Sequence, residues 1–241
     1  MLGVIYADGR NEGDRNLVDP DPREAVRWYR LAAERGHSGA QYNLGIHYMK
    51  GNGVEKDLQQ MHSWFEKAAE NGLAMAQYNV GVAYNEGRIV KRDYEKAVRW
   101  YRLAAEQGDE RAQYTLALLY ENGSGVAQSS EEAAGLYLKS AEGGYAQAQH
   151  NIGCCFTFGH GAPKDLAKAA HWYQQAAMQL HPWAQNNLGV FCQYGWGGLP
   201  RDLELASALY AAAASQGLEM AAENLRRLRA GTPAPAGDYG F

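Results

Sequence analysis

The chain has 241 residues with a formal net charge of −4, from 23 Lys and Arg against 27 Asp and Glu, and 46% of its residues are hydrophobic. This composition excludes collagen-like, disordered and strongly charged proteins. It also argues against a nucleic-acid partner, because neutralising phosphates needs a clustered surplus of Lys and Arg.

The N-terminal residues carry no recognisable export signal. Met1 is followed by Leu-Gly-Val-Ile-Tyr, without a basic region or a small-residue cleavage site, so any signal was removed or never existed. The compartment stays open: we favour the cytoplasm, and the periplasm or secretion would follow from a removed signal. The longest stretch without a charged side chain, residues 169–200, is interrupted by polar residues, Gly and Pro, so we expect no membrane insertion.

One string of residues recurs along the chain at a nearly constant interval. It begins as Ala-Gln-Tyr-Asn-Leu-Gly at Ala40 and returns with variations after 36, 36, 36, 36 and 37 residues, at Ala76, Ala112, Ala148, Ala184 and Ala221. A second string keeps the same spacing, with an aromatic pair such as Trp28-Tyr29 followed by two small residues such as Ala32-Ala33. This period is typical of stacked helical repeats.

Each repeat predicts two helices, A and B. Helix A places Ala40, Leu44, Gly45 and Tyr48 on one stripe. Its glycine costs about 1 kcal/mol in mid-helix, so its recurrence indicates close packing against helix B; the equivalents are Gly81, Gly153 and Gly189. Helix B begins after a residue that can cap its first turn, namely Asp21, Asp57, Asp93, Ser129, Asp165 or Asp202.

Glycine ends most B helices, where a left-handed cap is expected. These glycines are Gly36, Gly72, Gly108, Gly144 and Gly217. Leu180 takes this place once, so we expect that turn to be irregular.

A single helix pair cannot bury its apolar stripe, so consecutive pairs must stack. We therefore expect an all-α, right-handed superhelix, a solenoid of about six helix-turn-helix repeats of 36 residues that begins at Leu2, with a C-terminal capping helix near 220–229. Residues 1–229 would form a single domain. Residues 230–241, which contain Thr-Pro-Ala-Pro-Ala-Gly, would form a disordered tail.

The pattern Ala-x-x-Asn-Leu-Gly-x-x-Tyr, a glycine-rich turn, and then Asp-x-x-Lys-Ala-x-x-Trp-Tyr-x-x-Ala-Ala-x-x-Gly resembles the Sel1-like repeat (SLR) family, a relative of the tetratricopeptide repeats. The resemblance covers Leu2 to about Leu225, with departures at Thr115, Ala117, Leu136, Leu180 and Leu209. It implies a non-enzymatic adaptor, of a kind that includes bacterial proteins, which binds a protein or peptide, commonly on a concave face lined by the A helices. The partner's identity does not follow from the resemblance.

Candidate partner-binding residues lie on helix A, beside the core stripe and facing away from helix B. They occupy the positions of Tyr42, Asn43, Ile46 and Met49 in successive repeats, and the selected ones are Tyr42, Asn43, Tyr78, Asn79, Asn85, Tyr114, Glu121, His150, Asn151, Cys154, Asn186, Asn187, Val190 and Gln193. Amides can donate and accept together, which suits an extended peptide backbone. The same amides could instead stabilise a turn, and the aromatic residues could pack between neighbouring A helices.

Residues 143–200 contain three charged side chains, Lys164, Asp165 and Lys168, whereas the other 183 residues contain 47. Trp183 and Trp196 lie in this region outside the repeat core positions, so we expect both to be at least partly exposed and add both to the candidate set. Charge depletion with surplus aromatics is typical of interface centres, so we expect binding to be strongest toward repeats four and five, whose A helices begin near Ala148 and Ala184. The partner could be a foreign protein or a second copy, and uncharged polar residues could also simply keep this surface soluble.

The histidines and cysteines give little support for catalysis or metal binding. No His-x-x-x-His, Cys-x-x-Cys or Walker motif is present, so we expect no metal, no cofactor and no disulfide; Cys154, Cys155 and Cys192 are interpreted as free thiols. The sharpest enzyme alternative is a thiol hydrolase that uses Cys154 and His150, one helical turn apart. No third group to orient the imidazole is evident, so we expect that the protein is not an enzyme.

Overall fold

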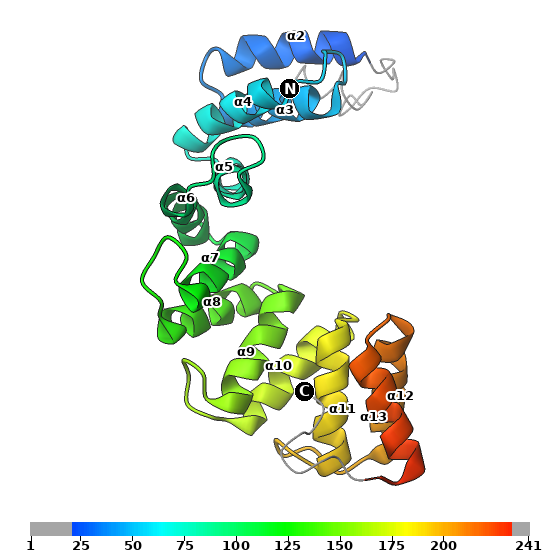
Figure 1. Ribbon diagram of the computed structural model, residues 1–241. Coiled ribbons are helices and arrows are strands. Elements are labelled where there is room, and N and C mark those ends of the chain that lie inside the picture. Colours follow the sequence, from blue (N-terminus) through cyan, green and yellow to red (C-terminus); the bar gives the residue numbers. More distant parts are fainter. Residues whose placement is uncertain (1–20, 233–241) are drawn as a thin grey trace, which may run out of the picture. The chain divides into compact units, whose positions relative to one another are not determined.

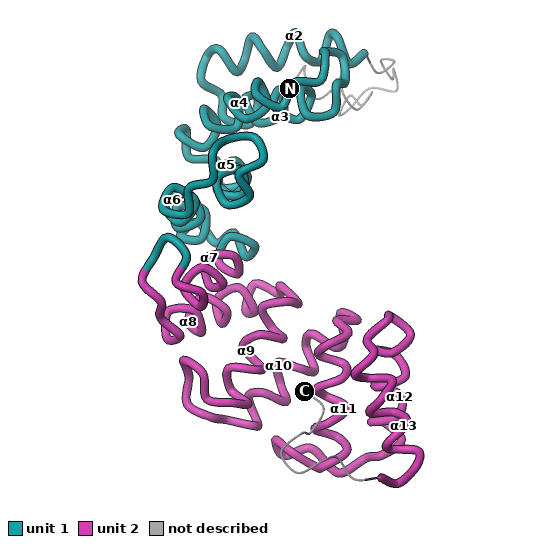
Figure 2. Tube along the Cα trace, viewed as in Figure 1, with its two compact units in different colours: residues 1–112, 124–126 teal, residues 113–123, 127–241 magenta. Residues whose placement is uncertain are grey.

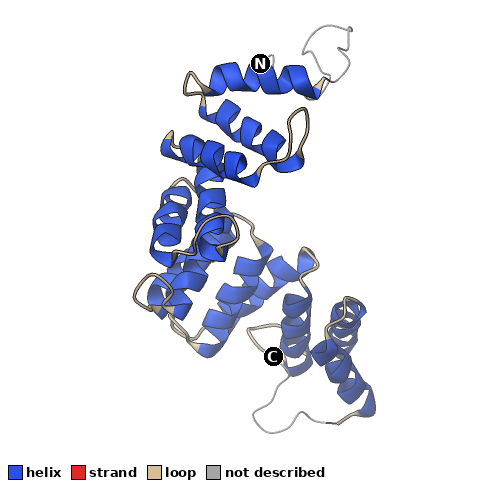
Figure 3. Ribbon diagram, turned by 45° about the horizontal axis from the view of Figure 1, so that its top comes forward, coloured by secondary structure: helices blue, strands red, loops and turns tan. Residues whose placement is uncertain are grey.

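The computed structural model describes residues 21–232, and this part of the chain contains twelve α-helices and no strand (Figures 1 and 3). The predicted first helix A, the loop that follows it to Pro20, and residues 233–241 of the predicted tail lie outside the described residues. The chain divides into two compact units, residues 1–112 with 124–126 and residues 113–123 with 127–241 (Figure 2). A single domain over residues 1–229 stays a prediction.

Unit 1 consists of alternating B and A helices. Its elements are α2 (Pro22–Ala33), α3 (Ser38–Lys50), α4 (Leu58–Glu70), α5 (Ala74–Glu86), α6 (Tyr94–Glu106) and the first turn of α7 (Glu110–Asn122). Its core lies between consecutive helices: Phe65 of α4 and Val80 of α5 belong to one buried cluster, and Tyr29 of α2 and Leu44 of α3 belong to another. The helix pair with its apolar stripe is therefore the structural repeat, as predicted.

Unit 2 continues the same alternation. It holds the rest of α7, then α8 (Ser130–Glu142), α9 (Ala146–Phe158), α10 (Leu166–Met178), α11 (Pro182–Tyr194), α12 (Leu203–Ser215) and α13 (Glu219–Ala230). One buried cluster runs through these helices and includes Tyr137, Tyr173, Phe191 and Tyr210. The predicted capping helix near 220–229 corresponds to α13.

The six predicted capping residues all precede B helices and accept backbone hydrogen bonds. Asp57, for example, accepts from Gln59 N at 2.9 Å and Gln60 N at 3.0 Å, and Ser129 Oγ accepts from Glu132 N at 3.2 Å. Equivalent bonds are made by Asp21, Asp93, Asp165 and Asp202. Each cap satisfies an N–H that the helix itself leaves unpaired, so these residues fix where the B helices begin.

The mid-helix glycines lie against the aromatic rings of the B helices. A Cβ added to Gly81 would lie 2.7 Å from Tyr101 Cδ1, and one added to Gly153 would lie 2.6 Å from Tyr173 Cε1. Gly45 and Gly189 make the same close approach to Phe65 and Tyr210. The predicted reason for the repeated glycine is confirmed.

The expectation of an irregular turn at Leu180 is wrong. Leu180 adopts φ +63°, the left-handed conformation that Gly144 adopts in the preceding B–A turn. His181 N donates to Ala176 O at 3.1 Å, and the equivalent bond from Tyr145 N to Ser140 O also measures 3.1 Å. Because the hydrogen bonds at the ends of α10 and α11 fix the backbone of this turn, Leu180 adopts the left-handed conformation that glycine would adopt without steric cost.

Candidate functional site

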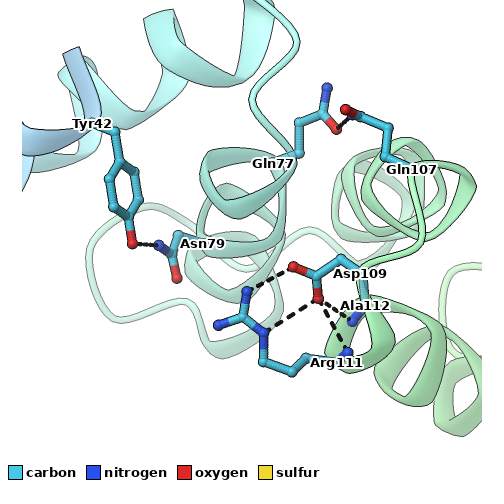
Figure 4. A network of polar contacts seen from close by, with 7 residues as sticks. All are labelled: Tyr42, Gln77, Asn79, Gln107, Asp109, Arg111 and Ala112. Carbon is cyan, nitrogen blue, oxygen red and sulfur yellow. Dashed lines mark hydrogen bonds and ion pairs between the residues drawn. The ribbon is translucent and has the colours of Figure 1, made fainter. Parts of the chain in front are cut away.

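The candidate residues of unit 1 lie on α3 and α5 and contact one another. Asn79 Nδ2 donates to Tyr42 Oη at 3.1 Å (Figure 4). The Tyr42 ring also stacks on Phe65 with centroids 4.9 Å apart. Tyr42 and Asn79 remain half-buried, as are Asn43 and Asn85. One aromatic residue and one amide of the predicted columns thus form a single contact between consecutive A helices.

Tyr78, the next member of the aromatic column, has a different neighbour. The Arg111 guanidinium lies 4.5 Å from the Tyr78 ring centroid, and Arg111 Nη2 forms an ion pair with Asp109 Oδ2 at 2.7 Å (Figure 4). Asp109 also accepts from the backbone N–H of Ala112 at 3.0 Å, so it caps the start of α7. The Asp109 hydrogen bond raises the pKa of Arg111, and this pair holds the cation over the tyrosine.

Contacts between the two predicted columns recur in unit 2, twice from an amide to an aromatic ring and once between two amides. Asn151 hydrogen-bonds Tyr114, Asn187 Nδ2 lies 3.4 Å from His150 Nε2, and Asn224 Nδ2 donates to Asn186 Oδ1 at 2.9 Å. Each pair joins two successive A helices. Asn186 and Asn187 are buried here, whereas Tyr114, His150 and Asn151 are half-buried. The two predicted columns are therefore linked side by side, and their packing role is realised in the structure.

The prediction that the candidates face away from helix B is wrong for Glu121 and Gln193, which occupy the position of Met49 and contact buried tyrosines of the B helices. Glu121 Oε2 accepts from Tyr137 Oη at 2.8 Å, and Gln193 Oε1 accepts from Tyr210 Oη at 2.8 Å. Where helix B carries Phe65 instead of tyrosine, the residue at this position is the apolar Met49, which packs against the same cluster. Glu121 is exposed and Gln193 half-buried, so each also presents surface to solvent.

Cys154 lies in a buried polar cluster on α9. Its Sγ is 3.5 Å from His150 Nε2 and accepts from Tyr173 Oη at 3.4 Å. Burial raises the pKa of the Cys154 thiol to about 11 and lowers the pKa of the His150 imidazole to about 4. Both groups are neutral at pH 7, whereas a thiol nucleophile requires a lowered cysteine pKa. The side chains are close, but their electrostatics oppose an activated thiolate.

The two unexplained tryptophans are partly exposed, as predicted. Trp183, the second residue of α11, is 43% exposed. Trp196 is half-buried and stacks on Tyr194 with ring centroids 5.3 Å apart. Val190, equivalent to Ile46, is fully buried and so belongs to the core.

Sequence reasoning missed the role of the glutamine in the Ala-Gln string. Gln77 is buried, donates to Ala69 O at 3.1 Å and accepts from Gln107 Nε2 at 2.7 Å (Figure 4). Gln149 makes the same two contacts, with Ala141 O at 3.2 Å and Gln179 Nε2 at 2.9 Å. The signal was present, because a glutamine that recurs at a core-facing position needs a buried partner.

The described residues contain neither a candidate metal site nor a candidate membrane-spanning helix. Between residues 21 and 232, no three His, Cys, Asp or Glu side chains are grouped so that they could hold a metal ion. In the same part of the chain, no helix combines the length and apolar character needed to cross a bilayer. All three cysteines are free thiols.

Comparison with known proteins identifies relatives along most of the chain. The Sel1 repeat model matches six segments, residues 1–37, 38–73, 74–109, 110–145, 146–179 and 184–218. A protective antigen of uropathogenic Escherichia coli strains, whose structure displays an SLR fold, is 35% identical with a TM-score of 0.83, and the match covers 93% of this chain and 46% of that one. A Sel1 repeat protein from Oxalobacter formigenes is 32% identical with a TM-score of 0.72, and the match covers 88% and 82%. This chain therefore spans about half the length of the E. coli antigen, and no curated protein matches it.

Proposed function

The chain belongs to the Sel1 repeat family, whose members are generally protein-interaction scaffolds, and from this premise we propose that it holds a protein or peptide partner on the A-helix face of unit 2. The face is formed by α9 and α11, the A helices of repeats four and five in the predicted scheme. Its contact side chains are the half-buried His150, Asn151 and Gln193.

The observation that carries this proposal is the absence of charge on these two helices. Neither α9 nor α11 contains Asp, Glu, Lys or Arg, and the three charged residues of the region 143–200 all lie near the start of α10. There Lys168 pairs with the capping residue Asp165 at 3.6 Å. A partner can cover such a face without desolvating an unpaired charge, which is the composition expected of an interface centre.

The polar side chains on this face provide directional contacts. Each amide has two donors and two acceptor lone pairs, and Asn151 uses these for Tyr114, Tyr137 and His150 Nδ1, which leaves one lone pair of its Oδ1 for a partner. Gln193 likewise uses one oxygen lone pair for Tyr210. Asn186, Asn187 and Val190 are buried and pack beneath the surface of this face. The half-buried His150, Asn151 and Gln193 are the side chains that would contact an extended peptide.

We propose no catalytic, nucleic-acid or cofactor role. The Cys154 and His150 pair is neutral at physiological pH for the reasons given above. The net charge of −4 disfavours phosphate-rich partners.

Site-specific photo-crosslinking tests the proposed face. A photoreactive phenylalanine analogue would replace Asn151 or Gln193 on the A helices, and His171, exposed on α10, would carry the same analogue as the matched control. We expect the same cellular protein to be crosslinked from Asn151 and Gln193 and not from His171. Crosslinking from His171 alone, or equal crosslinking from all three positions, would contradict a partner on the A-helix face.

A further inference from the structure

The turn between α10 and α11 exposes three large apolar side chains. Met178 at the end of α10 is 77% exposed, Leu180 in the turn is 67% exposed, and Trp183 in the first turn of α11 is 43% exposed. We refer to these three residues as the apolar turn. All of them belong to unit 2, and none is among the contact residues of the A-helix face proposed above.

The apolar turn departs from the four preceding B–A turns at Met178 and Leu180. The residue equivalent to Met178 is glutamate in the four preceding turns, and these residues are Glu34, Glu70, Glu106 and Glu142. The residue equivalent to Leu180 is glycine in the same turns, whereas the position of Trp183 varies and is occupied there by Gly39, Met75, Arg111 and Gln147. The Sel1 repeat matches run without interruption from residue 1 to 179 and leave out 180–183. The chain leaves its own repeat pattern here, and at Met178 and Leu180 the change is from a charged and a small residue to apolar ones.

The fold leaves most of Met178 and Leu180, and 43% of Trp183, in solvent. The hydrogen bonds of the turn come from neighbouring residues: Gln179 Nε2 donates to Gln149 and to Gly144 O, each at 2.9 Å, and His181 Nδ1 accepts from Ala184 N at 3.3 Å. Leu180 is held in the left-handed conformation, φ +63°, with its side chain in solvent. A strained residue whose side chain is not buried within its own chain indicates a contact with another molecule.

We propose that the apolar turn is a self-association surface, where a second copy of this chain docks so that Met178, Leu180 and Trp183 of one copy pack on the same residues of the other. The exposed area fits a weak dimer. A large apolar side chain presents on the order of 200 Å², so the three exposures amount to about 400 Å² in each copy, or about 800 Å² for two. A stable interface buries about 1,200 Å² or more. Since the apolar turn offers less than this area, we expect a reversible dimer whose population depends on the protein concentration.

The absence of charge at the apolar turn allows a second copy to dock on it. The region 143–200 carries three charged residues, all near the start of α10 and none in the turn. A copy of the same surface therefore brings no like charge against itself, despite the net charge of −4 on each chain. Two-fold symmetry also uses each apolar contact twice, which suits a small self-complementary patch.

Sedimentation velocity at several concentrations tests the proposal. The wild-type chain should rise from its monomer mass of 26.5 kDa at about 1 μM toward twice that mass above about 100 μM. The double variant Met178→Glu, Leu180→Gly carries the residues that the chain itself uses in its other B–A turns, and its dissociation constant should rise at least tenfold. Met75→Glu is the matched control, because Met75 is the 47%-exposed equivalent of Trp183 in unit 1 and should leave association unchanged.

A second measurement places the contact. The Leu180→Cys variant should form a covalent dimer under mild oxidation, because the two copies of residue 180 lie near the symmetry axis, whereas Met75→Cys should not. The native Cys155 and Cys192 are buried, and burial raises the pKa of the half-buried Cys154 to about 11, so the native thiols should contribute little background. The proposal is overturned if the wild type stays monomeric at 100 μM, if the double variant associates as the wild type does, or if both cysteine variants crosslink alike. None of these results bears on crosslinking of a foreign partner from Asn151 and Gln193.

Discussion

Replacing Leu180 by glycine should stabilise the protein although it removes a large hydrophobic residue. Leu180 has φ +63°, and its side chain is 67% exposed, so little burial is lost when it is removed. The turn keeps its hydrogen bonds in either case, because Leu180 N donates to Ala177 O at 2.9 Å through its backbone. The substitution therefore changes mainly the conformational energy of one residue.

The expected gain is the difference of two terms. A non-glycine residue pays about 1–2 kcal/mol to adopt the left-handed conformation. Glycine loses more backbone entropy on folding, which costs about 0.5–1 kcal/mol. The net stabilisation should be about 0.5–1 kcal/mol, equivalent to a rise in Tm of about 1–4 °C.

Urea unfolding followed by far-ultraviolet circular dichroism measures this difference, at about 1 μM so that self-association does not contribute. Gly144→Leu is the reciprocal control: Gly144 has φ +94°, and an added Cβ would meet no atom within 4 Å. It should be destabilised by a similar amount, by backbone strain without a clash. A less stable Leu180→Gly protein, or a Gly144→Leu protein as stable as the wild type, would refute the reasoning.

Three further predictions follow from packing and burial. Gly81→Ala should lower the free energy of unfolding by about 1 kcal/mol, because overpacking against Tyr101 costs about 1–3 kcal/mol and the higher helix propensity of alanine returns about 1 kcal/mol. Gly135→Ala on α8 is the control: an added Cβ meets no atom within 4 Å there, so this variant should be stabilised. Urea unfolding that finds Gly81→Ala the more stable of the two would contradict the packing argument. Burial lowers the pKa of His150 to about 4 in the folded protein, whereas the same histidine has a pKa of about 6.5 in the unfolded chain. As the pH falls below about 6.5, the unfolded chain takes up this proton and the folded protein does not, so the free energy of unfolding should fall by up to about 3 kcal/mol toward pH 4. His150→Asn should show a weaker pH dependence in thermal melts, and an unchanged dependence would contradict the assignment to His150. Because burial raises the pKa of Cys154 to about 11, iodoacetamide should alkylate it slowly in the native protein at pH 7.5 and rapidly after unfolding, as followed by mass spectrometry, whereas rapid native labelling would revive the thiol-hydrolase alternative.

The helices could be predicted from sequence because their signals are local. Asp57 and Ser129 cap helices that begin at the next residue, and a cap needs only its own turn to act. The mid-helix glycines were equally informative, since a residue that weakens a helix at a regular interval must be retained by packing. Leu180 shows the limit of local reasoning: its unsuitable propensity predicted an irregular turn, but the flanking α10 and α11 fix the backbone, so tertiary packing prevails over residue preference.

The candidate site was less predictable because its residues face other A helices. Whether Asn187 points into solvent or toward His150 depends on the spacing between α9 and α11, which no single repeat encodes. In the structure that spacing is short enough for Asn187 to be buried and to lie 3.4 Å from His150. The same uncertainty applied to Gln193, whose helical position gives no hint that Tyr210 of α12 would donate to it.

These contacts distinguish two kinds of surface in unit 2. On the A-helix face, polar side chains hold neighbouring helices together and keep part of their hydrogen-bonding capacity, so a partner there is recognised by direction as well as by contact area. At the apolar turn, Leu180 and Met178 offer contact area and no hydrogen bond from their side chains, so association there depends on hydrophobic burial and on concentration. Since the two surfaces use different side chains, a change at Leu180 should alter self-association and leave capture of a partner at Asn151 intact, whereas one shared surface would make both change together.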